Sequence, residues 1–207
     1  MAYFPLFIDL EGKPVLIVGG GSMARDKAHK LVGYGARITV IAPEIRPELA
    51  EIPGLVLLRR PFGPGDIQVE YAFVIAATDD NDVNRLIAAQ CRVRRIPVNV
   101  VDTQEECSFI FPSLVHRGPL SIGISTGGAS PAAAVRIRSE IEAGLPASTE
   151  EILLWLASLR SWLRGRTSGE PERKQIYRAL LEEALRVDRA LTPEETEAVV
   201  TRFVSQR

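Results

Sequence analysis

The sequence predicts an α/β fold, in which an open, doubly wound parallel sheet is followed by a small α+β segment and a helical C-terminal part. Up to about residue 112, short β-branched runs alternate with helical stretches, which is typical of a parallel sheet covered by helices. Strand-like runs then follow one another with no long helix between them. From Ser148 onward the pattern is helical only.

The parallel sheet is expected to have five strands, at residues 14–18, 37–42, 55–58, 71–76 and 96–101. A helix is expected over 22–32, because apolar residues recur there at a spacing that places them on one face. A second helix is expected over 82–93. Five strands with intervening helices favour a doubly wound sheet.

Residues 108–115 and 120–125 are expected to pair as antiparallel strands, and Ser130 and Pro131 then begin a helix as its N-cap and first residue. This segment is too small to bury its apolar faces alone, so a second copy of the chain is the expected partner. Two capping boxes, at residues 148–151 and 192–195, begin further helices. The expected domains are residues 1–112, 113–147 and 148–207.

Composition excludes several classes of protein. A formal net charge of -1 on 207 residues argues against the strongly basic surface that a nucleic-acid-binding protein uses. No stretch approaches the roughly 18 uninterrupted apolar residues of a membrane span, so no membrane partner and a cytoplasmic location are expected. Cys91 and Cys107 are too far apart for a CxxC motif, and His29 and His116 form no pair at metal-ligand spacing. No metal site is predicted.

The junction of the first strand and first helix carries a G-x-G-x-x-A motif formed by Gly19, Gly21 and Ala24. The first glycine allows a tight turn, the second lets a pyrophosphate approach the backbone, and the alanine lets helix and strand pack closely. The helix N-terminus, with Ser22 and Met23, presents free N–H groups to the phosphates. This context predicts a Rossmann-type dinucleotide site, and the alternative is a turn that merely needs glycines.

Other strand ends should complete this site. The second strand lacks the usual terminal Asp, so Glu44 or the backbone around Pro43 is expected at the adenosine ribose. No Arg stands directly at this strand end, which favours NAD over NADP. Three residues end the fourth strand beside the crevice: Ala76, Ala77 and Thr78. Thr78 fits equally well as a helix N-cap.

Asp102 follows the fifth strand, and open α/β sheets bind ligands beyond such strand ends. With Asn99 on the same strand, it can orient a substrate N–H and accept a proton while a hydride leaves to nicotinamide. The alternative is an Asp that only starts a turn. A second candidate site is the loop that leads into the helix at Pro131, where N–H groups can bind an anion; it consists of Ser125, Thr126, Gly127 and Gly128. Its alternative is a glycine turn with a Ser N-cap.

Four separated motifs occur in the order VLIVGGGSMARDKAHKL, AATDD, NVVD before SFIFPS, and ISTGGASP. Together they resemble the precorrin-2 dehydrogenase / sirohydrochlorin ferrochelatase family over about residues 3–146. The resemblance implies NAD-dependent oxidation of precorrin-2 to sirohydrochlorin in a homodimer, with Asp102 as the key catalytic residue. Some members also insert Fe²⁺. The loop at 125–128 is then expected to bind carboxylates of the tetrapyrrole.

This chain has Thr126 where some members carry Ser, so a hydroxyl is kept but a role specific to Ser is not implied. Two other functions remain open. A Rossmann-type nucleotide-binding regulatory module would keep the glycine loop without needing Asp102 in the crevice. A nicotinamide oxidoreductase for a small hydroxy or amino acid would ordinarily use a Lys, Tyr or His in the cleft.

Overall fold

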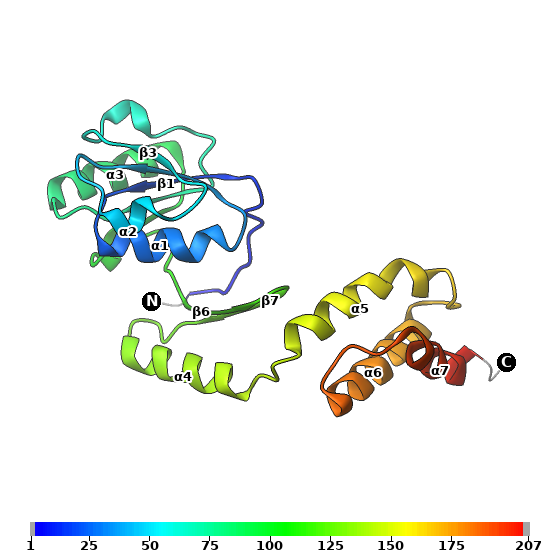
Figure 1. Ribbon diagram of the computed structural model, residues 1–207. Helices are drawn as coiled ribbons and strands as arrows, with labels where there is room; N and C mark the ends of the chain where they lie inside the picture. The colour runs from blue at the N-terminus through cyan, green and yellow to red at the C-terminus, as the bar shows by residue number, and fades with distance from the viewer. Residues whose placement is uncertain (1–2, 205–207) are drawn as a thin grey trace. The chain divides into compact units, whose positions relative to one another are not determined.

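The structure is a computed structural model that describes residues 3–204 (Figure 1). It forms two compact units, one of residues 5–111 and one of residues 112–204 together with residues 3 and 4. The second unit contains both the segment expected over 113–147 and the helices expected from 148, so that finer division stays a prediction. Within the described part of the chain, no helix is long and apolar enough to cross a bilayer.

The first unit is built on a five-stranded parallel sheet in the order β3-β2-β1-β4-β5. Its strands are β1 (Pro14–Val18), β2 (Arg37–Ile41), β3 (Val56–Leu58), β4 (Phe73–Ala76) and β5 (Val98–Val100). Because β1 lies between β2 and β4, the chain first adds strands on one side of β1 and then on the other, which makes a topological switch point at its carboxyl end. The predicted doubly wound fold is confirmed.

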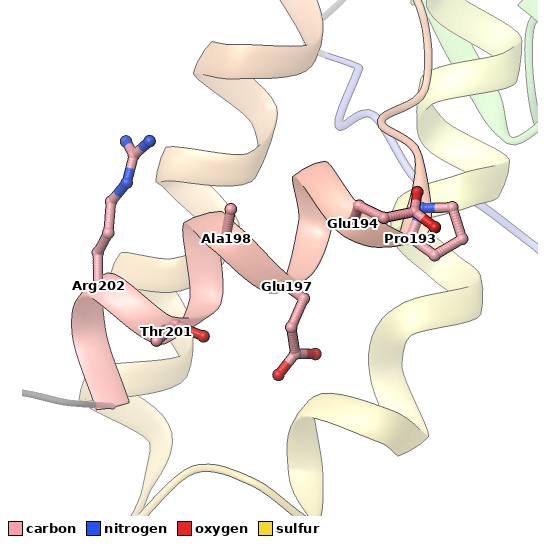
Figure 2. Close-up of a pocket in the computed structure, with 6 residues that line it drawn as sticks. All are labelled: Pro193, Glu194, Glu197, Ala198, Thr201 and Arg202. Carbon is pink, nitrogen blue, oxygen red and sulfur yellow. The ribbon is translucent and has the colours of Figure 1, made fainter.

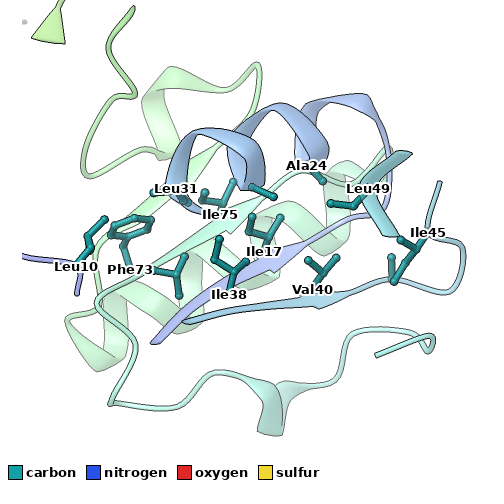
Figure 3. Packing of buried hydrophobic residues seen from close by; sticks show 13 residues of the cluster. Leu10, Ile17, Ala24, Leu31, Ile38, Val40, Ile45, Leu49, Phe73 and Ile75 are labelled. Atoms are coloured by element: carbon teal, nitrogen blue, oxygen red, sulfur yellow. The ribbon is translucent and has the colours of Figure 1, made fainter. Parts of the chain in front are cut away.

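Helices cover both faces of this sheet. They are α1 (Ser22–Val32), α2 (Pro47–Ala50) and α3 (Asn81–Arg94), with single 3₁₀ turns η1 (Pro64–Asp66) and η2 (Gln104–Glu106). Successive strand residues face opposite sides, so Ile17 joins a cluster with α1 whereas Leu16 joins one with α3. Figure 3 shows the first cluster, in which Ile17 and Ile75 of the sheet pack beneath Ala24 and Leu31.

Two predicted strands differ from the structure: the one at 96–101 is too long, and the one at 108–115 is displaced. β5 ends at Val100 because Asp102 has a φ of 59°, which turns the chain out of the extended conformation. The strand predicted over 108–115 is wrong in its first half, since β6 begins at Ser113. Residues 107–109 instead fold back along β5 and bond to it largely through side chains.

The second unit begins with an antiparallel pair, β6 (Ser113–Arg117) and β7 (Leu120–Ile124), followed by four helices. The helices are α4 (Pro131–Gly144), α5 (Thr149–Arg164), α6 (Glu170–Val187) and α7 (Pro193–Val204). As predicted, Ser130 caps α4, because its hydroxyl accepts a hydrogen bond of 3.1 Å from the Ala133 N–H.

Only the second of the two predicted capping boxes is formed. The Thr192 N–H donates to Glu195 over 2.8 Å, and the Glu195 N–H donates back to the Thr192 hydroxyl over 3.3 Å. Ser148 makes no cap, because its backbone is already helical and its hydroxyl donates to Asp188, which follows α6. The box at 148–151 is therefore wrong, and the serine links two helices instead.

The helical part has a core of its own that centres on Leu163, Ile176 and Leu180, each fully buried. We expect Leu163→Ala to lower the free energy of unfolding by about 2–5 kcal/mol, because it leaves a cavity in this core. Leu154, on the same helix, is 53% exposed, and its replacement by Ala should change that energy by less than about 0.5 kcal/mol. Urea denaturation of the full chain measures both, and equal effects would contradict this core.

Candidate functional site: a dinucleotide edge

The carboxyl ends of the central strands are held side by side by backbone hydrogen bonds. The Gly19 N–H donates to the Ile41 carbonyl over 2.9 Å, and the Ala77 N–H donates to the Val18 carbonyl over 2.7 Å. The segments that follow β1, β2 and β4 therefore begin at one edge of the sheet, at its switch point. This is where ligands bind in open α/β sheets.

Two glycines of the turn after β1 are required by the protein's own packing. A Cβ on Gly19 would lie 2.1 Å from the Ala77 carbonyl oxygen, and Gly19 has a φ of 128°. A Cβ on Gly20 would lie 1.9 Å from the Glu44 carbonyl oxygen, and the Gly20 carbonyl accepts a hydrogen bond from the Arg46 N–H over 3.0 Å. The sequence motif missed Gly20, although three consecutive glycines are a visible signal.

Gly21 is different, because nothing in the protein requires a glycine there. Its φ of −86° suits any residue, and a Cβ on it would meet no atom within 4 Å. It is the N-cap of α1, and no side chain caps this helix end. Open space in front of an uncapped helix N-terminus is the environment that a pyrophosphate uses, so these residues fit a dinucleotide.

The other residues expected at this site lie in or near the same turn, and Ala24 lies as the G-x-G-x-x-A motif requires. Ala24 is fully buried between α1 and the sheet, whereas Ser22 and Met23 are exposed on the first turn of the helix. Pro43 and Glu44 are exposed on the loop after β2. The guanidinium of Arg59, just after β3, donates to the Ile45 carbonyl of that loop over 3.3 Å. The sequence did not reveal this arginine, because it comes from the adjacent strand.

The end of β4 is fixed by a buried asparagine that the sequence did not single out. Ala76 is buried and Ala77 half-buried. Asn84 of α3 donates to the Thr78 carbonyl over 2.9 Å and accepts from the Thr78 hydroxyl over 2.8 Å. Thr78 is not the N-cap of α3, since Asp80 accepts the hydrogen bonds of the first helical N–H groups. The alternative of Thr78 as a helix cap is therefore wrong.

Asp102 stands exposed in the turn after β5. Its left-handed backbone is a conformation that Asp and Asn adopt more readily than most residues. Asp102 thus forms a turn after the strand, as the alternative interpretation of the sequence expected. The same turn leaves its carboxylate open to solvent, and its catalytic role stays a prediction.

The chain after Asp102 is anchored along the outer side of β5. The Val98 N–H donates to the Ser108 hydroxyl over 2.7 Å, and the Val100 N–H donates to the Cys107 thiol over 3.1 Å. Burial raises the pKa of the Cys107 thiol. The Asn99 side chain is buried and donates to the Phe109 carbonyl over 3.1 Å. Asn99 thus has a structural role, and its contact with a substrate stays a prediction.

The loop from Ser125 to Gly128 belongs to the second unit. Its hydroxyls bond within the loop: Ser125 accepts from the Gly127 N–H over 3.1 Å, and Thr126 donates to the Ser130 carbonyl over 3.0 Å. Gly127 and Gly128 have φ values of 63° and 89°, so both need glycine for the turn. The glycine-turn interpretation is supported, and anion binding there stays a prediction.

Two depressions lie elsewhere, both in the helical part. One, of about 710 Å³, runs along α7, where Figure 2 shows Glu194, Glu197 and Arg202 among its lining side chains. The other, of about 500 Å³, is bordered by Trp155 and Trp162. Neither includes a residue that the sequence assigned to a site. Among residues 3–204 no group of three His, Cys, Asp or Glu side chains could hold a metal ion.

Comparison with known proteins agrees with the geometry of the edge. Residues 6–113, more than half of the chain, match the family described as "Putative NAD(P)-binding". The chain belongs to this family. Residues 117–144 match the family described as sirohaem biosynthesis protein central. The resemblance predicted from the four motifs is thereby confirmed, and so is a nicotinamide dinucleotide of the NAD(P) class as the cofactor.

Individual relatives point the same way. A siroheme synthase of Ectopseudomonas mendocina is 47% identical over 72% of this chain, and siroheme synthase 3 of Aeromonas hydrophila is 40% identical over 87%. This chain spans only 32% and 39% of their lengths. The solved structure of SirC, precorrin-2 dehydrogenase, is 27% identical with a TM-score of 0.68, and the match covers 97% of this chain and 98% of SirC.

Two neighbouring glycines offer a matched test of this edge. We expect Gly20→Ala to destabilise the protein by about 1–3 kcal/mol, because its methyl group collides with the Glu44 carbonyl. Gly21→Ala should leave the free energy of unfolding nearly unchanged, yet weaken NAD⁺ binding about 5- to 150-fold, because the same methyl group meets the pyrophosphate. Denaturation and calorimetry measure the two quantities, and undiminished NAD⁺ affinity of Gly21→Ala would refute the site.

Proposed function

We propose that this chain is an NAD-dependent dehydrogenase that oxidises precorrin-2 to sirohydrochlorin in siroheme biosynthesis. The observation that carries the proposal is the match to SirC, precorrin-2 dehydrogenase, which extends over both units of the fold. The glycine turn after β1 supports the proposal, because it fits a dinucleotide. Asp102 follows β5 of the same sheet. A small hydroxy or amino acid as substrate finds no comparable support.

In this reaction precorrin-2 loses a hydride and a proton. NAD⁺, when bound, accepts the hydride. The Asp102 carboxylate takes the proton as general base, for which its exposure and its place after β5 suit it. Glu44 would hold the adenosine ribose of the cofactor, and its negative charge would disfavour a 2'-phosphate, so that NAD is preferred over NADP. The backbone N–H groups near residues 125–128 receive carboxylates of the tetrapyrrole.

A regulatory module would bind NAD⁺ without turning over a substrate. Anaerobic incubation of the protein with precorrin-2 and NAD⁺, followed by absorbance, separates the two functions, because only the dehydrogenase yields the sirohydrochlorin spectrum together with NADH. Adding Fe²⁺ to the product mixture tests the iron insertion that the resemblance implies for some family members.

The second unit supports a homodimer. Of the residues of α4, Ala134 is buried in the chain, whereas Val135 and Ile137 are 51% and 41% exposed. Two strands and one helix bury little apolar surface by themselves, and a second copy of the same segment covers it. We expect light scattering at micromolar concentration to give twice the mass of the chain. A stable monomer under these conditions would rule out an obligate dimer.

Asp102→Asn is the sharpest test of the base, because Asn adopts the same left-handed turn and keeps the size of the side chain. We expect the dehydrogenase rate at saturating substrate to fall by about 10²- to 10⁴-fold, the usual contribution of a positioned base. NAD⁺ affinity should stay close to that of the parent. An unchanged rate combined with weaker substrate binding would make Asp102 a substrate-binding residue instead.

A further inference from the structure

Arg59 is an exposed cation directly after β3 that the proposed reaction has not used. Its Nη1 donates to the Ile45 carbonyl, in the loop after β2, over 3.3 Å. The next residue, Arg60, is occupied elsewhere, because its guanidinium forms hydrogen bonds of 2.7 and 2.6 Å with Asp66. Among residues 3–204, no carboxylate forms an ion pair with Arg59. A guanidinium has five N–H donors, so most of those of Arg59 are available to a ligand.

The acceptor of this hydrogen bond belongs to a well-anchored part of the loop. The Ile45 side chain is buried in the core cluster that Figure 3 shows, together with Leu49 of α2. Its backbone lies against the glycine turn after β1, since a Cβ on Gly20 would lie 2.9 Å from the Ile45 Cα. The N–H of the following residue, Arg46, donates to the Gly20 carbonyl over 3.0 Å. Arg59 is thus attached to the segment that packs on the glycine turn.

These contacts limit how far the guanidinium lies from the proposed pyrophosphate site. The Cα and the carbonyl oxygen of one residue are about 2.4 Å apart. The Arg59 Nη1 is therefore within about 9 Å of the Cβ position of Gly20. Gly21, the next residue, borders the open space in front of the α1 N-terminus. Because a single ribose separates the pyrophosphate of a dinucleotide from its 2'-position, the guanidinium is close enough to contact a group on that ribose.

The strand order places Arg59 on the adenosine side of the site. In the order β3-β2-β1-β4-β5, β2 and β3 lie on one side of β1, and β5 with Asp102 after it lies on the other. The adenosine ribose of a Rossmann-type site contacts the end of the second strand. The adenosine half of the cofactor is therefore expected over β2, next to the loop that carries the Arg59 hydrogen bond.

Two opposite charges border this loop. Glu44 is exposed, and its carboxylate repels a phosphate. The guanidinium of Arg59 attracts one, and its planar fork of N–H groups can bind two phosphate oxygens at once. The 2'-position is where the two cofactors differ, since NAD⁺ has a hydroxyl there and NADP⁺ has a phosphate. The loop therefore combines one group that favours NAD⁺ with one that favours NADP⁺.

We propose that Arg59 is a specificity-determining residue that binds the 2'-phosphate of NADP⁺, so that the protein accepts NADP⁺ as well as NAD⁺. Glu44 opposes this contact and keeps NAD⁺ the tighter ligand. The end of β2 lacks an arginine, and the adjacent strand supplies one. This inference rests on the proposed place of Glu44 at the adenosine ribose, and not on the oxidation of precorrin-2.

Calorimetry of the full chain with NAD⁺ and with NADP⁺ tests the contact. We expect the parent to bind both dinucleotides. Arg59→Met should weaken NADP⁺ binding by about 10- to 150-fold, as the loss of a hydrogen bond between charged groups does. It should leave NAD⁺ affinity nearly unchanged, because NAD⁺ has no charge at the 2'-position. Arg59→Lys should lose less NADP⁺ affinity, since an ammonium keeps the charge without the fork.

Arg37→Met is the matched control. Arg37 also donates a hydrogen bond to a backbone carbonyl, that of Gly12 over 2.8 Å, but it begins β2 and so lies at the opposite end of that strand. The variant removes the same charge from the protein and should keep the parent affinity for both dinucleotides. Equal loss of NADP⁺ binding in Arg37→Met and Arg59→Met would reduce the effect to net charge and overturn the proposal.

The ³¹P resonance of bound NADP⁺ gives a readout that a purely structural role of Arg59 would not change. The second pKa of a phosphate monoester is about 6. A neighbouring cation lowers this pKa by favouring the dianion, and a neighbouring carboxylate raises it. The pKa of the bound 2'-phosphate should therefore be higher in Arg59→Met than in the parent. In Glu44→Gln it should be lower, and NADP⁺ should bind more tightly.

The competing roles give different results. If Arg59 only fixed the loop, Arg59→Met would weaken NAD⁺ and NADP⁺ binding by the same factor. If Arg46, exposed on the same loop, were the phosphate ligand, Arg46→Met would lower NADP⁺ affinity and Arg59→Met would not. Either result overturns the proposal, as does a parent that binds NAD⁺ but not NADP⁺. A protein that binds both as expected yet leaves precorrin-2 unoxidised would refute only the proposed function.

Discussion

The close approach of two backbone carbonyls to the turn after β1 is the constraint on which the nucleotide edge depends. The carbonyls of Ala77 and Glu44 lie where Cβ atoms of Gly19 and Gly20 would otherwise stand. Their contact brings the ends of β1, β2 and β4 together and fixes the point at which α1 begins. The helix therefore starts without a side-chain cap, in front of the open space at Gly21. Two glycines are required by the fold, and the third borders the open space in which we propose that the cofactor binds.

Sequence reasoning succeeded where the signal was local. β1 and α1 have the predicted bounds, because a strand buried on both faces and a helix with one apolar face leave clear patterns. The capping box at Thr192 succeeded for the same reason, since its partners are three residues apart. The box at Ser148 failed because Asp188, far along the chain, takes the hydroxyl.

The misses within the site have the same origin. Gly20 is needed because of the Glu44 carbonyl, which approaches it only in the folded chain. Asn84 is important because of its hydrogen bonds to Thr78. Neither requirement produces a fixed residue spacing that a sequence motif could describe. The sequence singled out Asp102 by its place after a strand, but it did not predict that the backbone of Asp102 is left-handed.

The anchoring of residues 107 and 108 on β5 also affects how readily the protein aggregates with neighbouring molecules. β5 is an outer strand of the sheet, and such a strand ordinarily offers a row of free N–H and C=O groups to any extended chain. Here the outward-facing groups of Val98 and Val100 are occupied by the side chains of Ser108 and Cys107. The backbone groups of Val98 and Val100 are therefore not free to pair with a strand of a neighbouring molecule. Two small side chains thus protect this border against the edge-to-edge stacking from which aggregates grow.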